Sequence, residues 1–289
     1  MQIVILNEPN YRAGGIESIY QLCHTINESG GEGYIYFINR HSNPVPDEYK
    51  KYNIRILDEI IDEPGYLYII PEAWTGRLDE ISKAKKAIWW LSVDNNYDKF
   101  QSFGNDDIIH FYQSEYAKNF LIKNGTKNVY PIHDYIEGVE YDGTVKYRVV
   151  CYNPVKGREA AEYVIRKCPD ITFIPLVNMT KEQITDALKR SMIYIDFGHH
   201  PGRDRIPREA ALLHNIILTS RIGSAEFYED IPILDIYKYP SLSSTIKEDI
   251  THYLDNYYEK INDFEFYRTQ IQNQKLVMRE EVDNILGIL

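Results

Sequence analysis

The sequence predicts an α/β fold with two doubly wound parallel sheets and a group of C-terminal helices. Three observations lead to this prediction. Short apolar stretches of strand type alternate with longer amphipathic stretches of helix type through most of the 289 residues. The polar segment Glu137–Lys146 divides this alternation into two series. From about Ser244 onward the strand-type stretches stop and the pattern becomes helical.

The first series opens with a strand, a glycine-containing loop and a helix. The strand is Gln2–Leu6, the loop ends at Gly14 and Gly15, and the helix Ile16–Ser29 has its apolar residues on one face. The loop lacks the GxGxxG spacing, and no acidic residue closes the next strand, Tyr34–Ile38, so a nicotinamide cofactor is disfavoured. We expect the two glycines to allow a ligand to approach the backbone closely.

Two strand-type stretches of the first series lead into acidic residues. Tyr66–Ile70 is followed closely by Glu72, and Ala87–Val93 (AIWWLSV) is followed directly by Asp94. Because the carboxyl ends of parallel strands meet at one edge of a sheet, these carboxylates are candidates for a general base or for binding acceptor hydroxyls. A turn or N-cap role for Asp94, before two asparagines, is the alternative.

The second series begins directly after the polar segment. Arg148–Tyr152 is a strand-type stretch, and the NPVKG loop that follows it carries Lys156. A lysine at this place would meet a phosphate as a point charge, or would remain a solvated loop residue. We place the first domain at residues 1–138 and the second at 147–265, with a C-terminal helix over about 270–289 completing the first.

The stretch Tyr194–Pro232 carries the strongest functional signal in the chain. It predicts a strand, a polar loop, a helix beginning near Pro207, a second strand over Ile216–Thr219, and a loop that contains Gly223 and Ser224. An arginine-rich loop that leads into a helix N-terminus is suited to binding phosphate. The basic residues of this first loop and of the start of the helix are His199, His200, Arg203, Arg205 and Arg208.

Individual residues of this stretch have more than one interpretation. Glu209, in the first turn of the predicted helix, would accept hydrogen bonds from ribose or sugar hydroxyls, or would only complement the helix dipole. Of the three arginines, we expect one or two to face a ligand and the rest to pair with acids such as Asp204. His199 and His200 lack a further ligand at helical spacing, so we interpret them as hydrogen-bonding loop residues and expect no metal site.

Composition and charge argue against several classes of protein. The formal net charge of −11 argues against a protein that grips nucleic acid, although it permits a local basic pocket. Three widely spaced cysteines without a CxxC pair predict reduced thiols in a cytosolic protein. The chain starts with a strand pattern rather than a signal peptide, and no apolar stretch approaches the roughly 18 residues that span a bilayer. We therefore expect a cytoplasmic protein, at most in peripheral contact with the inner face of a membrane.

The loops of the second series resemble those of GT-B glycosyltransferases, most closely the family 4-like group (glycosyl transferases group 1), which uses nucleotide sugars. Lys156 in NPVKG matches the basic residue that follows the first strand of that family's second domain. PGRDRIPREAA lies over the family's Glu-x7-Glu element, and Glu209 matches its second glutamate, which is associated with the nucleotide ribose. Gly223 and Ser224 resemble the phosphate-side loop of the family.

The first series resembles the same family less closely. Gly14 and Gly15 are similar to the family's N-terminal glycine pair. Pro201, however, stands where the family has its first glutamate, which contacts the transferred sugar. Ser92-Val93-Asp94 stands about where an N-domain histidine is often found.

The resemblance implies two Rossmann-like domains facing a cleft. It also implies a metal-independent hexosyltransferase that moves a sugar from a nucleotide-diphosphate donor to a glycan or lipid-linked acceptor in polysaccharide biosynthesis, without a further cofactor. Gly14 and Gly15 would lie on the acceptor side, with Asp94 as a catalytic candidate. Two alternatives remain open: a catalytically silent nucleotide- or glycan-binding subunit of a polysaccharide assembly complex, which the departures favour, and an epimerase of the same fold. The implied donor-binding residues are Lys156, Arg203, Arg205, Arg208, Glu209, Gly223 and Ser224.

Overall fold

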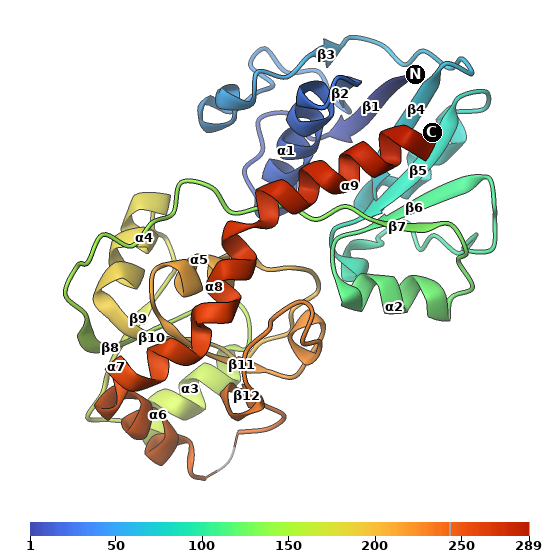
Figure 1. Cartoon of the computed structure of the whole chain (residues 1–289). Helices are drawn as coiled ribbons and strands as arrows, with labels where there is room; N and C mark the ends of the chain where they lie inside the picture. The colour runs from blue at the N-terminus through green and yellow to red at the C-terminus, as the bar shows by residue number, and fades with distance from the viewer. Residues whose placement is uncertain (243, 289) are drawn as a thin grey trace. The chain divides into compact units, whose positions relative to one another are not determined.

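The computed structural model describes residues 1–242 and 244–288. The chain forms two compact units, and each is built on its own parallel sheet (Figure 1). Unit 1 comprises Met1–Tyr135 and Gln274–Leu289, and unit 2 comprises Ile136–Asn273. The segment Glu137–Lys146, expected to be a linker because of its polar composition, belongs to unit 2. In the described part of the chain, every helix is too short or too polar to cross a lipid bilayer.

The sheet of unit 1 has seven strands in the order β3-β2-β1-β4-β5-β6-β7, and all neighbouring pairs are parallel. The order changes direction between β1 and β4, so the loops after these two strands lie at the topological switch point, where such sheets bind ligands. The strands are β1 (Gln2–Asn7), β2 (Glu32–Phe37), β3 (Ile56–Leu57), β4 (Tyr66–Pro71), β5 (Lys85–Trp90), β6 (Ile108–Tyr112) and β7 (Val129–Pro131).

Both faces of this sheet are covered, because alternate residues of each strand point to opposite sides. Ile3 and Ile5 of β1 pack in one apolar cluster, while Val4 and Leu6 pack in another. The first cluster contains residues of α1 (Gly14–Glu28) and of α9 (Gln274–Ile288), which lie against each other (Figure 1). The remaining elements of the unit are α2 (Glu115–Lys123) and the 3₁₀ segments η1 (Asp47–Tyr52), η2 (Glu72–Glu80) and η3 (Val93–Asn95).

The sheet of unit 2 has five parallel strands in the order β12-β11-β10-β8-β9. The chain goes from β8 to its neighbour β9 and then crosses to β10 on the other side of β8, so the switch point lies between β8 and β10. The strands are β8 (Tyr147–Tyr152), β9 (Thr172–Pro175), β10 (Ser191–Asp196), β11 (Ile216–Ser220) and β12 (Lys238–Tyr239).

The helices of unit 2 pack on a core that runs through β8, β10 and β11. The helix over 181–190 begins at a capping box formed by Thr180 and Gln183. The Thr180 hydroxyl accepts from Gln183 N at 3.3 Å, and the Gln183 side chain accepts from Thr180 N at 2.8 Å. The helical elements are α3 (Arg158–Lys167), α4 (Lys181–Arg190), α5 (Arg205–Leu212), α6 (Ile246–Asp255), α7 (Tyr257–Lys260), α8 (Glu265–Gln272), η4 (Ser224–Glu226), η5 (Asp235–Tyr237) and η6 (Ile261–Phe264).

Candidate functional site

The candidate site lies at the switch point of unit 2, where the loops after β8 and β10 meet. Glycines allow the two loops to touch. A Cβ atom added to Gly157 would lie 2.6 Å from the backbone nitrogen of Gly198, and one added to Gly198 would lie 2.6 Å from Cβ of Lys156. Gly157 also has a φ of +63°, in the left-handed region that favours glycine. This close approach places Lys156 against the loop that follows β10.

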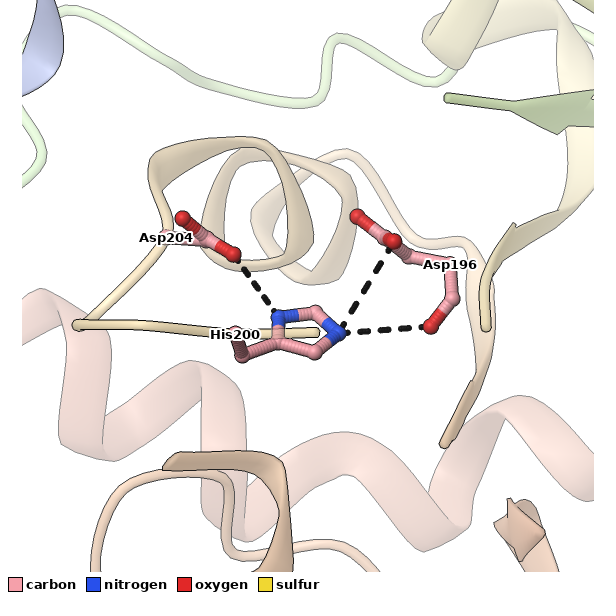
Figure 2. A group of neighbouring side chains, drawn as sticks. All are labelled: Asp196, His200 and Asp204. Atoms are coloured by element: carbon pink, nitrogen blue, oxygen red, sulfur yellow. Dashed lines mark hydrogen bonds and ion pairs between the residues drawn. The ribbon is translucent and has the colours of Figure 1, made fainter. Parts of the chain in front are cut away.

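Four charged side chains from these loops form one connected group, which we call the loop cluster: Lys156, Asp196, His200 and Asp204. Lys156 Nζ donates to both carboxylate oxygens of Asp204, at 2.6 and 2.7 Å. His200 lies between the two aspartates (Figure 2), with Nδ1 2.8 Å from Asp204 Oδ2 and Nε2 3.8 Å from Asp196 Oδ1. His200 Nε2 is also 3.3 Å from the backbone oxygen of Asp196.

Two side chains of the loop cluster are buried, and the other two are partly exposed to solvent. The side chains of His200 and Asp196 are 0% and 1% exposed, whereas those of Asp204 and Lys156 are 22% and 31% exposed. The hydroxyl of Tyr194 donates to Asp196 Oδ2 at 2.9 Å and so fixes the position of this carboxylate. The buried pair, Asp196 and His200, is therefore fixed in position, and a ligand would contact the partly exposed pair, Asp204 and Lys156.

The neighbouring charges decide the protonation of the cluster. Burial by itself would lower the pKa of His200, but the Asp204 and Asp196 carboxylates outweigh it and the pKa is raised. Burial would likewise raise the pKa of Asp204, but His200 and Lys156 outweigh it and the pKa is lowered. For Asp196 burial dominates, and its pKa is raised in spite of His200. In the fully ionised form, the two cations balance the two carboxylates.

Asp196, His200 and Asp204 are also a possible set of metal ligands, since their ligand atoms lie within 4.8 Å of one another. The ammonium group of Lys156, however, contacts both oxygens of Asp204, the positions from which this carboxylate would coordinate an ion. The arrangement is therefore that of a hydrogen-bonded charge network. The expectation of no metal site rested on the absence of a further ligand at helical spacing, and that premise was wrong, because Asp196 and Asp204 stand four residues before and four residues after His200.

The predicted arginines take different positions around the cluster. Arg208 is 1% exposed and donates to backbone oxygens of its own loop, to Arg203 at 2.8 Å and to Asp204 at 3.3 Å. It therefore holds the loop in shape. Arg205 Nε lies 3.8 Å from Glu209 Oε1, one turn further along α5, with both side chains largely buried. Glu209 thus has a cationic neighbour on its own helix.

The second predicted loop is bound tightly to the first. Gly223 has a φ of +70°, and a Cβ atom there would lie 2.0 Å from the backbone oxygen of His200. Ser224 N donates to the same oxygen at 2.8 Å, and its hydroxyl donates to the backbone oxygen of Gly202 at 2.7 Å. Gly223 and Ser224 therefore fix the position of the loop that contains His200 by close packing and by these two hydrogen bonds.

The predicted residues of unit 1 lie at the carboxyl edge of its own sheet. Gly14 and Gly15 are the first two residues of α1, and Asp94 lies in η3 after β5. Glu72 is buried and accepts from the backbone nitrogens of Leu91 and Ser92, both at 2.9 Å. Burial raises its pKa to about 7. Glu72 thus supports the turn that leads to Asp94.

Sequence reasoning missed the roles of Asp196, His200 and Asp204 in the cluster. One signal was available, since Asp196 is the only charged residue of β10 and ends a strand that is buried throughout. The partner of Asp204 could not be found in this way. Asp204 and Lys156 are 48 residues apart and meet only because β8 and β10 are neighbours.

Comparisons with known proteins identify the fold. No protein-family model matches the chain. No curated protein matches it in sequence. Solved structures do match over full length: HepE of Anabaena in complex with UDP-glucose has a TM-score of 0.71 at 10% sequence identity, covering 100% of both chains. Sucrose-phosphate synthase of Thermosynechococcus elongatus has a TM-score of 0.63 at 12% identity, again covering 100% of both chains.

A glycosyltransferase of Rickettsia africae also matches, with a TM-score of 0.62 at 12% identity, covering 99% of this chain and 97% of the other. These structural neighbours are glycosyltransferases of GT-B type. The mixed α/β chain with two parallel sheets therefore has the GT-B fold that the sequence predicted.

Proposed function

We propose that this chain is a glycosyltransferase that moves a sugar from a nucleotide-diphosphate donor to a glycan or lipid-linked acceptor. The observation that carries the proposal is the position of Lys156, a partly exposed cation at the switch point of the second sheet in a GT-B fold. The switch point is where parallel sheets bind ligands. The likeness to HepE, whose structure contains UDP-glucose, adds support for a nucleotide sugar.

The donor diphosphate would bind at the outer side of the loop cluster. Lys156 supplies a flexible positive charge, Arg203 lies in the loop that leads into α5, and Arg205 is the first residue of that helix. Glu209 is the fifth residue of α5, which begins earlier than predicted, so it lies beyond the first turn; it is the candidate for the ribose hydroxyls. Charges held in place before the reaction stabilise negative charge that develops during it, so no metal ion is required in this proposal.

In the transfer step, the bond between the anomeric carbon and the diphosphate oxygen breaks, and the diphosphate leaves with the bonding electrons. Lys156 would stabilise this developing charge. A hydroxyl oxygen of the acceptor forms the new bond to the anomeric carbon, and its proton passes to a base, for which Asp94 is the candidate. Gly14 and Gly15 would allow the acceptor to approach the start of α1.

A catalytically silent subunit that binds a nucleotide or a glycan is the second candidate. The resemblance raises it, because it puts Pro201 at the position of a sugar-contacting glutamate, and the contact between Lys156 and Asp204 is compatible with it, but the structural neighbours do not favour it. A silent protein would keep the fold and nucleotide binding without transferring sugar. The two candidates therefore differ in turnover and not in affinity.

Calorimetric titration with UDP-, GDP- and ADP-sugars tests the proposal. We expect one of these donors to bind, and Lys156→Ala to weaken that binding by about tenfold or more. A folded sample that binds none of the donors would overturn the proposal. Donor hydrolysis or transfer is then compared among the wild type, Lys156→Ala and Glu209→Ala. Equal background rates in all three, with nucleotide still bound, would establish the silent subunit instead.

A further inference from the structure

The two most exposed side chains of the loop cluster are bonded to each other. Lys156 and Asp204 are 31% and 22% exposed, and the ammonium group contacts both oxygens of the carboxylate. A ligand phosphate that approaches Lys156 therefore meets an ion pair that already exists. The phosphate has to share the lysine with a carboxylate of this chain, or take its place.

Asp204 keeps a second partner when Lys156 turns away. His200 Nδ1 lies 2.8 Å from Asp204 Oδ2, and His200 is itself 0% exposed and placed beside Asp196. The carboxylate therefore stays charged and stays in place beside an incoming phosphate. Lys156 has a flexible four-carbon side chain, so rotation about its own bonds is enough for the exchange.

The charge of the ligand decides how strongly this carboxylate opposes binding. A nucleoside diphosphate has an unesterified terminal phosphate, which loses a second proton near pH 6. The corresponding nucleotide sugar is esterified at that phosphate and carries one negative charge less at neutral pH. A fixed carboxylate at the diphosphate position repels the more highly charged ligand more strongly.

Resting on the proposed function, we propose that Asp204 is a specificity-determining residue of the donor site. Its carboxylate competes with ligand phosphate for Lys156, and it weakens the binding of the nucleoside diphosphate product more than that of the nucleotide-sugar donor. The consequence is easier release of product after transfer. The chain thereby avoids being blocked by its own product, the more highly charged of the two ligands.

The test is calorimetric titration of the wild type and Asp204→Asn with UDP-glucose and UDP, GDP-glucose and GDP, and inorganic pyrophosphate. Asparagine keeps the size of the side chain and removes its charge. We expect the diphosphates and pyrophosphate to bind the variant about tenfold more tightly than the wild type, and the matching nucleotide sugar about threefold more tightly. Asp204→Ala serves the same purpose if the asparagine variant does not fold.

Two controls separate this effect from a general change of charge. Asp142→Asn removes the same charge from an exposed aspartate whose partner is Lys189 at 2.6 Å, and it should leave all affinities unchanged. Asp204→Asn combined with Lys156→Met should keep only part of the gain in affinity, because the repulsion by the carboxylate is removed but no lysine is released to the ligand. Persistence of the full gain in the double variant would contradict competition for Lys156.

Other outcomes overturn the inference in recognisable ways. An equal gain for diphosphate and nucleotide sugar, or no gain, refutes the discrimination while leaving donor binding by the wild type intact. Weaker binding by Asp204→Asn shows instead that Asp204 positions Lys156 for the ligand. If neither the wild type nor the variants bind any of these ligands, the proposed function fails and this inference fails with it.

Discussion

Glu281 of α9 binds His133 twice, although the two residues are 148 positions apart in the chain. Its Oε2 accepts from the backbone nitrogen of His133 at 2.8 Å, and its Oε1 lies 2.5 Å from the imidazole Nδ1. This pair joins the last helix of the chain to the segment that follows β7. It is the polar counterpart of the apolar packing of α9 on α1.

Replacing Glu281 by glutamine should therefore destabilise unit 1. Glutamine still accepts one hydrogen bond, but it loses the charge-assisted contact with the imidazole, so we expect a loss of about 1 to 2 kcal/mol in the free energy of unfolding. Urea denaturation followed by tryptophan fluorescence measures this loss, because Trp74, Trp89 and Trp90 all lie in unit 1. Glu280→Gln, on an exposed position of the same helix, is the control. Equal stability of the two variants would show that the pair does not hold α9.

Glu72 should make the stability of unit 1 depend on pH. Burial raises its pKa from 4.5 to about 7, so between these values the folded state binds a proton that the unfolded state has lost. The free energy of unfolding from this group is therefore highest below pH 4.5 and falls by about 3 kcal/mol as the pH rises through 7. Urea titrations at several pH values from 5 to 8 measure the slope.

Two variants test whether Glu72 causes this pH dependence of the free energy of unfolding. Glu72→Gln should make it shallower, because glutamine does not titrate, whereas Glu63→Gln, at an exposed position of the same unit, should leave it unchanged. If Glu72→Gln retains the full slope, another group is responsible for it.

Lys146 should make the stability of unit 2 depend on pH in the opposite direction. It is 5% exposed, donates to the backbone oxygens of Leu188 and Leu213 at 2.8 and 2.5 Å, and burial lowers its pKa from 10.5 to about 7. Above pH 7 the unfolded state binds a proton that the folded state lacks, so stability from this group rises by about 2 kcal/mol between pH 7 and 9.

Calorimetric or circular-dichroism melting of Lys146→Met measures this effect. Lys146→Met should lose both hydrogen bonds, and its stability should no longer rise between pH 7 and 9. Lys181→Met, at an exposed position of the same unit, should behave as the wild type. A Lys146→Met protein whose melting temperature still rises with pH would contradict the assignment.

Gly198→Ala should disturb the candidate site through sterics alone. The added Cβ would lie 2.6 Å from Cβ of Lys156 and 2.8 Å from the backbone nitrogen of Gly157, so the two loops would have to separate. We expect a loss of about 2 kcal/mol in stability and a loss of nucleotide affinity of about tenfold or more. Gly104→Ala is the control, because a Cβ there meets no atom within 4 Å. Unchanged affinity in Gly198→Ala would show that the contact between the loops is dispensable.

The sequence by itself determined those features that depend on residues close together in the chain. The alternation of strand-type and helix-type stretches predicted two parallel sheets, and the spacing of Thr180 and Gln183 is a local signal for the start of α4. Lys156 and the loop after β10 were expected at the same edge, because each directly follows a strand of one sheet. These inferences succeed because hydrophobic period and capping are local properties.

Tertiary structure alone decided which charged groups became partners. Asp196, His200 and Asp204 are spaced like residues on one helix face, yet they lie in and around a loop, and their common neighbour Lys156 comes from another strand. Arg208, one of three arginines expected either to face a ligand or to pair with acids, donates to the carbonyls of its own loop. Sequence reasoning could not foresee these partners, because the order of β8 and β10 in the sheet sets the distances between their loops.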